Sequence, residues 1–132
     1  MITYAGLDHV QVVAPPGCEA AARTFYGDLL GMTEVPKPAD MARRGGCWFQ
    51  CGEQQIHVGV ETEFTAARKA HPAIRLADRA SFEALVSRLE AKGAEVKRNR
   101  EMEAAGVERF FVSDPWGNRL EMMLVQTARG AG

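Results

Sequence analysis

Residues with metal-binding side chains recur at matching positions in two similar halves of this chain. The halves correspond at a shift of 64 residues, which places Val10 on Ile74 and His57 on Glu121. His9, on the first strand-like segment, would join them from a third strand. Two imidazoles and one carboxylate that leave coordination positions open are typical of a catalytic rather than a structural metal site. The pattern therefore predicts His9, His57 and Glu121 as ligands of one divalent ion, with Zn, Fe, Mn, Ni and Co as candidates.

Composition limits the classes of protein to which the chain can belong. It has 132 residues, 46% of them hydrophobic and 25% charged, and a net charge of −1. These values are typical of one compact domain and provide no basic surface for nucleic acid. No apolar run reaches the ~20 residues of a membrane-spanning helix, and no signal-peptide pattern opens the sequence. Three cysteines are an odd number, so we expect reduced thiols and a cytoplasmic protein.

Strand and helix signals occur in the same order in both halves. In the first, alternating residues predict a strand at 7–14, a helix at 18–30 and strands at 32–36, 46–51 and 54–61. In the second, they predict a strand at 72–77, a helix at 79–92 capped by Asp78 or Ser81, and strands at 94–98, 107–113 and 118–125. We therefore expect an α+β fold of two tandem βαβββ modules, at 1–61 and 71–127, with a connector at 62–70. The two modules would form one compact domain.

The two modules are expected to pair into a curved, partly closed eight-stranded cup, because one such sheet alone leaves a face uncovered. The first and fourth strand of each module would direct alternate side chains into this cup. If the turn at Gly52-Glu53 has two residues, Trp48 lies opposite His57 and Gln50 opposite Gln55. A slip of one residue would bring Phe49 and Cys51 there instead. The predicted substrate contacts are Gln11, Trp48, Gln50, His71, Arg75 and Trp116.

Two segments resemble a known family. The opening Gly6-Leu7-Asp8-His9-Val10 with Phe25-Tyr26-Gly27-Asp28-Leu29-Leu30-Gly31-Met32, and the closing Phe110 to Glu121 with its Asp114-Pro115-Trp116-Gly117-Asn118 turn, are similar to the vicinal oxygen chelate superfamily. That superfamily includes glyoxalase I, bleomycin-resistance proteins and extradiol dioxygenases. The resemblance implies paired βαβββ modules, frequent homodimers, and metal ligands from the first and fourth strand of each module. His9, His57 and Glu121 match three such places. The fourth is occupied by Ala73, and His71 lies two residues before it.

Three functional interpretations follow from these residues. The first is a metalloenzyme, with lyase, isomerase or dioxygenase chemistry, whose small substrate chelates the ion through adjacent oxygens and in which Glu121 moves a proton. The second is a metal-free protein that binds an antibiotic or another aromatic molecule between Trp48 and Trp116. The third is a structural or regulatory module with a vestigial cup. Glu121 also has an alternative without a metal, because Arg75 or Arg119 would neutralise its carboxylate. A homodimer is expected, with the modules of one cup contributed by one chain or exchanged between two.

Overall fold

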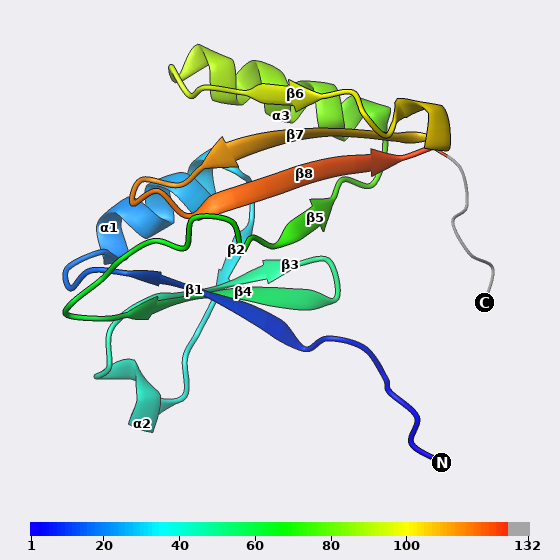
Figure 1. The fold of residues 1–132 in the computed structure, drawn as a ribbon. Coiled ribbons are helices and arrows are strands. Elements are labelled where there is room, and N and C mark those ends of the chain that lie inside the picture. The colour runs from blue at the N-terminus through cyan, green and yellow to red at the C-terminus, as the bar shows by residue number, and fades with distance from the viewer. Residues whose placement is uncertain (127–132) are drawn as a thin grey trace. The chain divides into compact units, whose positions relative to one another are not determined.

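The computed structural model describes residues 1–126, which fall into two compact units, Met1–Ala66 (unit 1) and a second that starts at Ala67 (unit 2). Each unit holds one four-stranded sheet of mixed direction and its own helices, so the fold is α+β and neither sheet closes into a barrel (Figure 1). The α+β class and the two βαβββ modules are thus confirmed. The boundary between the units lies inside the expected connector at 62–70. The module boundaries, and the joining of the modules into one domain with a shared cup, stay predictions.

Unit 1 begins with a strand, passes through a helix and returns in three further strands. Its elements are β1 (His9–Ala14), α1 (Glu19–Ala22), η1 (Arg23–Leu29), β2 (Thr33–Val35), α2 (Ala39–Ala42), β3 (Cys47–Cys51) and β4 (Gln54–Val60). The strand order is β1-β4-β3-β2, with β1 parallel to β4 and the remaining pairs antiparallel. Apolar side chains on alternate positions of the strands are buried, among them Val12, Phe49 and Val58. The opposite face carries His9, Trp48 and His57.

Unit 2 repeats this plan. Its elements are β5 (Ala73–Arg75), α3 (Arg79–Ala91), β6 (Lys97–Asn99), η2 (Glu103–Ala105), β7 (Val107–Ser113) and β8 (Arg119–Val125), with strand order β5-β8-β7-β6. The side chain of Asp78 accepts a 2.7 Å hydrogen bond from the backbone N–H of Ser81, which confirms Asp78 as the cap of α3. The buried face of α3 packs on β8, where Leu120 and Met122 are also buried.

The helical predictions differ from the structure in two respects. The first helix is α-helical only to Ala22 and continues as the π-helix η1, in which the Leu30 N–H donates to the Phe25 carbonyl, five residues back. The spacing of apolar residues in a seven-residue segment is too short a pattern to distinguish a π-helix from an α-helix. The one-turn helices α2 and η2 were not predicted, because segments this short have no apolar periodicity to read.

The hairpin of unit 1 has the predicted register. Trp48 is opposite His57 and Gln50 is opposite Gln55. The turn between β3 and β4 consists of two residues, in which Gly52 takes a positive φ of 60°. Trp48 therefore lies on the same face of the sheet as His57.

The internal repeat does not keep one uniform shift, which corrects the sequence alignment of the two halves. Gln11 pairs with His57 in unit 1, whereas Ala73 pairs with Glu121 in unit 2. If His57 is matched with Glu121, the first strands are offset by 62 residues, from 11 to 73, rather than by 64. Gly31 and Gly93, which follow the two helices with positive φ, are also 62 apart. On this register His9 corresponds to His71, and Ala73 corresponds to Gln11.

Candidate functional site

His9, His57 and Trp48 form a stack of three rings on one face of the unit 1 sheet. The His57 ring lies 4.0 Å from the His9 ring, at an interplanar angle of 13°, and 4.0 Å from the Trp48 ring, at 5°. The stack follows from the registers, because Trp48 faces His57 across one ladder and Gln11, next to His9 on the same face, faces it across the other. His57 is left 6% exposed. The structure thus brings together the two predicted histidine ligands and one predicted substrate contact.

The environment of His57 favours its neutral form. Burial, and secondarily the nearby His9, lower the pKa of the His57 imidazole from its ordinary value of 6.5. Its Nε2 lies 2.9 Å from Gln55 Oε1, and Asp8 Oδ2 lies 2.9 Å from His9 Nδ1. A neutral imidazole carries a lone pair, which is the form that ligates a metal or accepts a proton.

We expect this lowered pKa to make the stability of the metal-free protein fall with acidity. Unfolded His57 takes up a proton near pH 6.5, and the folded residue does so only at lower pH. Its stabilising contribution is therefore complete above 6.5 and is lost as the pH falls toward the folded pKa. Denaturant unfolding in chelator between about pH 7.5 and 5.5 measures this loss. A His57→Gln variant should show a flatter pH dependence, and equal slopes for the two proteins would contradict the assignment.

A cavity of about 640 Å³ adjoins the stack, and all of its lining residues lie in unit 1. His9, His57 and Trp48 form part of its wall, and the segment around α2 contributes Lys37, Met41 and Arg44. Gln11 also lines it. A Cβ atom on Gly59 would come within 2.8 Å of the Gln11 amide carbon, so this glycine is what allows Gln11 to lie across β4. The cavity therefore combines aromatic rings, two amides, two cations and the carboxylate of Asp8.

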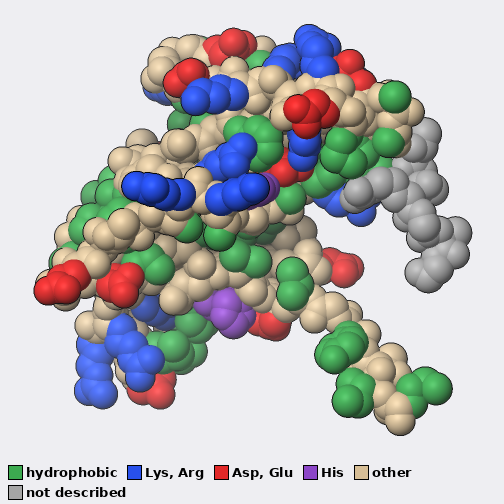
Figure 2. All heavy atoms as spheres, viewed as in Figure 1, with side chains coloured by type: hydrophobic (Ala, Val, Ile, Leu, Met, Phe, Trp, Pro, Cys, Tyr) green, Lys and Arg blue, Asp and Glu red, His purple; other side chains and the backbone are tan. Residues whose placement is uncertain are grey.

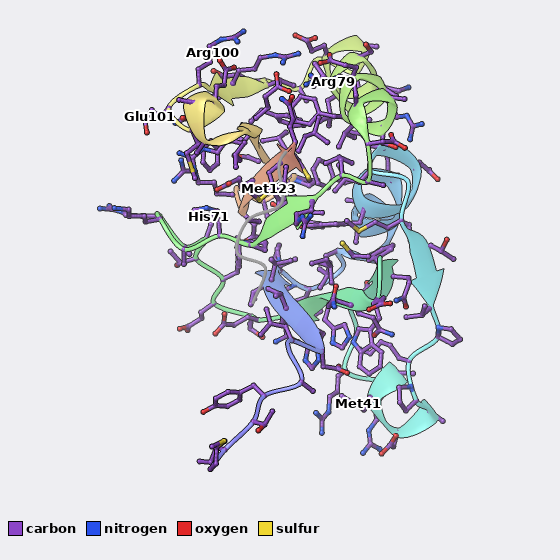
Figure 3. All side chains as sticks on the ribbon, turned by 90° about the vertical axis from the view of Figure 1, so that its right-hand side faces the viewer. Met41, His71, Arg79, Arg100, Glu101 and Met123 are labelled. Atoms are coloured by element: carbon purple, nitrogen blue, oxygen red, sulfur yellow. The ribbon has the colours of Figure 1, made fainter. Side chains whose placement is uncertain are left out.

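In unit 2, Glu121 and His71 form the pair that corresponds to His57 and His9. His71 Nε2 lies 3.0 Å from Glu121 Oε1, and Glu121 is 6% exposed. His71, labelled in Figure 3, lies just before β5, where its Nδ1 is 2.8 Å from the Lys69 carbonyl oxygen. An imidazole held on both nitrogens has a fixed orientation. The sequence predicts His71 as a substrate contact that borders the cup or approaches the metal, and in the structure His71 contacts Glu121.

The cation that neutralises Glu121 is Arg109, which the sequence analysis missed. Arg109 Nη1 lies 3.5 Å from Glu121 Oε1, whereas Arg75 and Arg119, the expected partners, form no ion pair within the described chain. Arg109 precedes Phe111 on β7, and Phe111 is opposite Glu121 in the ladder. The signal was present in the alternation of β7, since residues 107, 109 and 111 share a face. Arg109 Nε is buried without a hydrogen-bond partner in the described chain.

Gln50 adjoins the unit 1 pair, because its Oε1 accepts a 3.4 Å hydrogen bond from Gln55 Nε2 and Gln55 Oε1 contacts His57 Nε2. Gln50 donates to the carbonyls of Gly52 and Gln54 and so belongs to the hairpin turn. Trp116 lies in the turn between β7 and β8, and its N–H donates to Asp114 Oδ1. Arg75 is exposed on β5. Within the described part of unit 2, neither Arg75 nor Trp116 forms a hydrogen bond or ion pair with Glu121 or His71.

Within neither unit do three or more His, Cys, Asp or Glu side chains of the described residues gather as a metal-binding group. Each unit contributes one pair, His9 with His57 or His71 with Glu121. The imidazole and carboxylate side chains of these pairs are of the types that bind first-row divalent metal ions.

The family model of the Glyoxalase/Bleomycin resistance protein/Dioxygenase superfamily matches residues 6–122. The chain therefore belongs to this superfamily, whose members typically bind a divalent metal and small-molecule substrates and are often dimeric. No helix of the described residues is long and apolar enough to cross a membrane.

Solved structures agree with this assignment. A glyoxalase family protein from Bacillus anthracis is 48% identical, with a TM-score of 0.87 over 95% of this chain and 99% of that one. Lactoylglutathione lyase from Agrobacterium tumefaciens is 21% identical (TM-score 0.71; 93% and 96% covered). The fosfomycin resistance protein FosX from Listeria monocytogenes is 15% identical (TM-score 0.71; 92% and 94% covered). The last two are similar in fold alone. No curated protein matches the chain.

Proposed function

We propose that this protein is a divalent-metal-dependent enzyme acting on a small substrate with adjacent oxygens, by lyase, isomerase or dioxygenase chemistry. His9, His57 and Glu121 are the proposed ligands, and the corrected register adds His71 as a fourth. The observation that carries the proposal is the matched pairing: His9 with His57 in unit 1, and His71 with Glu121 in unit 2. Zn, Fe, Mn, Ni and Co all suit mixed imidazole and carboxylate donors.

The bound ion would supply Lewis-acid chemistry to the substrate oxygens. The chain's own residues prepare the site for this role. Glu121 is a buried carboxylate that lies 3.5 Å from Arg109 Nη1, and it is the proposed acceptor of a substrate proton. His71 orients it through the 3.0 Å contact. In unit 1, Trp48 provides a flat apolar wall and Gln11 an amide for polar groups of the substrate.

Ligation requires the unit 1 imidazoles to turn. Parallel stacked rings direct their in-plane lone pairs side by side rather than toward one point, and His57 Nε2 is held by Gln55. We therefore expect metal binding to break the contact between the His9 and His57 rings. The fluorescence of Trp48, which stacks on His57, should change with it, and a Trp116→Phe variant isolates that signal because the chain has two tryptophans.

Metal uptake tests the proposal directly. Protein purified without a histidine tag should bind close to one equivalent of Zn, Mn, Fe, Ni or Co, with the fluorescence change saturating at the same stoichiometry. If none of these ions binds, the metalloenzyme proposal fails.

The second candidate is a metal-free binding protein for an aromatic ligand, favoured by the cavity of about 640 Å³ walled by Trp48. It predicts saturable binding of aromatic compounds that is unaffected by chelator and is weakened by Trp48→Ala. Trp116, the second predicted aromatic wall, lines neither of the cavities described for this chain, and Trp116→Ala tests whether it contributes to binding. Binding that disappears with chelator would favour the metalloenzyme instead.

We further propose a homodimer in the cytoplasm. Large apolar side chains are exposed along the N-terminal segment, namely Met1, Ile2, Tyr4 and Leu7 (Figure 2), and β1 and β5 each end a sheet with one edge unpaired within that sheet. A second copy of the chain could cover such surfaces. The three cysteines are free, as expected in a reducing compartment. Light scattering that gives a monomer mass at tens of micromolar protein would contradict the dimer.

A further inference from the structure

A second cavity, of about 400 Å³, lies entirely within unit 2 and plays no part in the metal proposal. It is lined by the edge of the sheet at β6 and by the ends of β7 and β8, next to the Asp114–Asn118 turn. Its charged lining residues are Arg68, Glu95, Lys97 and Arg119. Their formal charges leave a local excess of two positive charges in a chain whose net charge is −1.

Two of the three cations that line this cavity have no ion-pair partner among the described residues. Arg68 and Arg119 form no ion pair with any residue of the described part of the chain, and Lys97 lies 3.8 Å from the exposed Glu95. The hydroxyl group of Ser113 also lines the cavity. Figure 2 shows Lys and Arg side chains gathered over β7 and β8. The excess positive charge that Arg68 and Arg119 bring to one concave site is repulsive, and a bound anion relieves this repulsion.

Arg119 is held in place by an aromatic ring. Its guanidinium carbon lies over the Phe111 ring, 4.0 Å from the ring centre, and this cation–π contact fixes the position of the guanidinium. A fixed guanidinium of this kind suits bidentate hydrogen bonding to an oxyanion. The same ring is in edge contact with His71, at 5.4 Å, and is opposite Glu121 in the ladder. Phe111 therefore lines the basic cavity and also contacts His71, the partner of Glu121.

We infer that this cavity binds a dianionic oxyanion group, such as a phosphoryl group, on the substrate whose reacting end meets Glu121. The excess of two positive charges matches a dianion better than a single carboxylate. The assignment of the group to the substrate rests on the proposed function. Binding of the oxyanion itself does not, because every residue of the cavity lies outside the proposed ligand set.

The test uses the full chain and inorganic phosphate, with acetate as the monoanion. In two-dimensional ¹⁵N–¹H spectra, phosphate should shift the amide signals of Ala94, Ser113 and Gly117 saturably, and acetate should bind more weakly. Arg119→Gln should weaken phosphate binding about tenfold or more, as expected for the loss of a hydrogen bond to a charged group. Lys97→Gln should weaken it less. Lys92→Gln removes an exposed lysine of the same unit that lines no described cavity and forms no described ion pair, and it should leave phosphate binding unchanged.

Three results would overturn the inference: no saturable shifts in the wild-type protein, acetate binding as tight as phosphate, or equal losses in Lys92→Gln and Arg119→Gln. The spectra of each variant show whether it is folded. Metal content measured on the same samples separates the two proposals. Metal uptake without phosphate binding refutes this inference alone, and phosphate binding without metal uptake refutes the proposed enzyme function while leaving the oxyanion site.

Discussion

Replacing Glu121 with Gln is expected to weaken divalent-metal binding by at least about 100-fold, a larger loss than the removal of an outer-shell partner usually causes. Glu121 supplies the only negative charge among the proposed ligands, and an amide oxygen is a much weaker donor. The variant should remain folded, because the amide can still accept a hydrogen bond from Arg109 or His71. A loss of about 1–3 kcal/mol in the free energy of unfolding is expected from the altered pairing.

A matched control is available on the same arginine. Glu101 Oε2 lies 3.7 Å from Arg109 Nη2 but has an exposed side chain, and Figure 3 shows it in the segment between β6 and β7. Glu101→Gln should leave both metal affinity and stability nearly unchanged, as expected for an exposed ion pair. Metal titrations and urea unfolding of the two variants beside wild type measure both effects. Equal metal affinity in Glu121→Gln and wild type would remove Glu121 from the ligand set.

The largest expected effect on stability comes from Gly46→Ala. Gly46 has a φ of 83°, and a Cβ atom there would clash with the carbonyl oxygen of Val58. Its N–H also donates a 2.6 Å hydrogen bond to Glu19 Oε2. The start of β3 would have to move away from β4. We therefore expect the free energy of unfolding to fall by about 3–5 kcal/mol, as is found at strained or overpacked sites.

Gly52→Ala separates the effect of the close contact from that of the backbone angle. Gly52 has a similar φ, 60°, but nothing lies within 4 Å of the place that a Cβ atom would occupy. The Gly52→Ala substitution should lower the free energy of unfolding by about 1–2 kcal/mol, the usual cost of placing an L-residue other than glycine in the left-handed backbone region. The two midpoints in urea should therefore differ clearly, and similar midpoints would show that the backbone near Gly46 adjusts freely.

Much of this fold could be predicted from the sequence, because strong local signals lie at the right places. The strand at 107–113 has the predicted ends, and the two-residue turn at Gly52-Glu53 sets the pairing of Trp48 with His57. Asp78 was identified as a cap because only a short polar side chain satisfies the first amides of a helix. Signals of this kind act over a few residues and need no knowledge of distant contacts.

The site could be predicted only in part, since it depends on register between strands distant in sequence. A uniform shift of 64 residues matches His9 with Ala73. The strand ladders instead match His9 with His71. The parallel pairs β1–β4 and β5–β8 have no turn to fix their register, so a shift of two residues decides which side chains meet. The choice of Arg109 over Arg75 and Arg119 as the partner of Glu121 depends instead on the register of the antiparallel β7–β8 ladder across a five-residue turn.

The turns between the last two strands differ in length between the units, with two residues after Cys51 and five between Ser113 and Arg119. In the longer turn Asp114 accepts hydrogen bonds from the Trp116 and Asn118 amides and from the Asn118 side chain. The turn is thus stabilised by its own contacts, and the flanking ladders keep their pairing. Descendants of a duplicated gene can in this way change loop length on one copy only, without displacing inherited functional positions. Ancestry in such proteins is better traced by hydrogen-bonded partners than by counting residues.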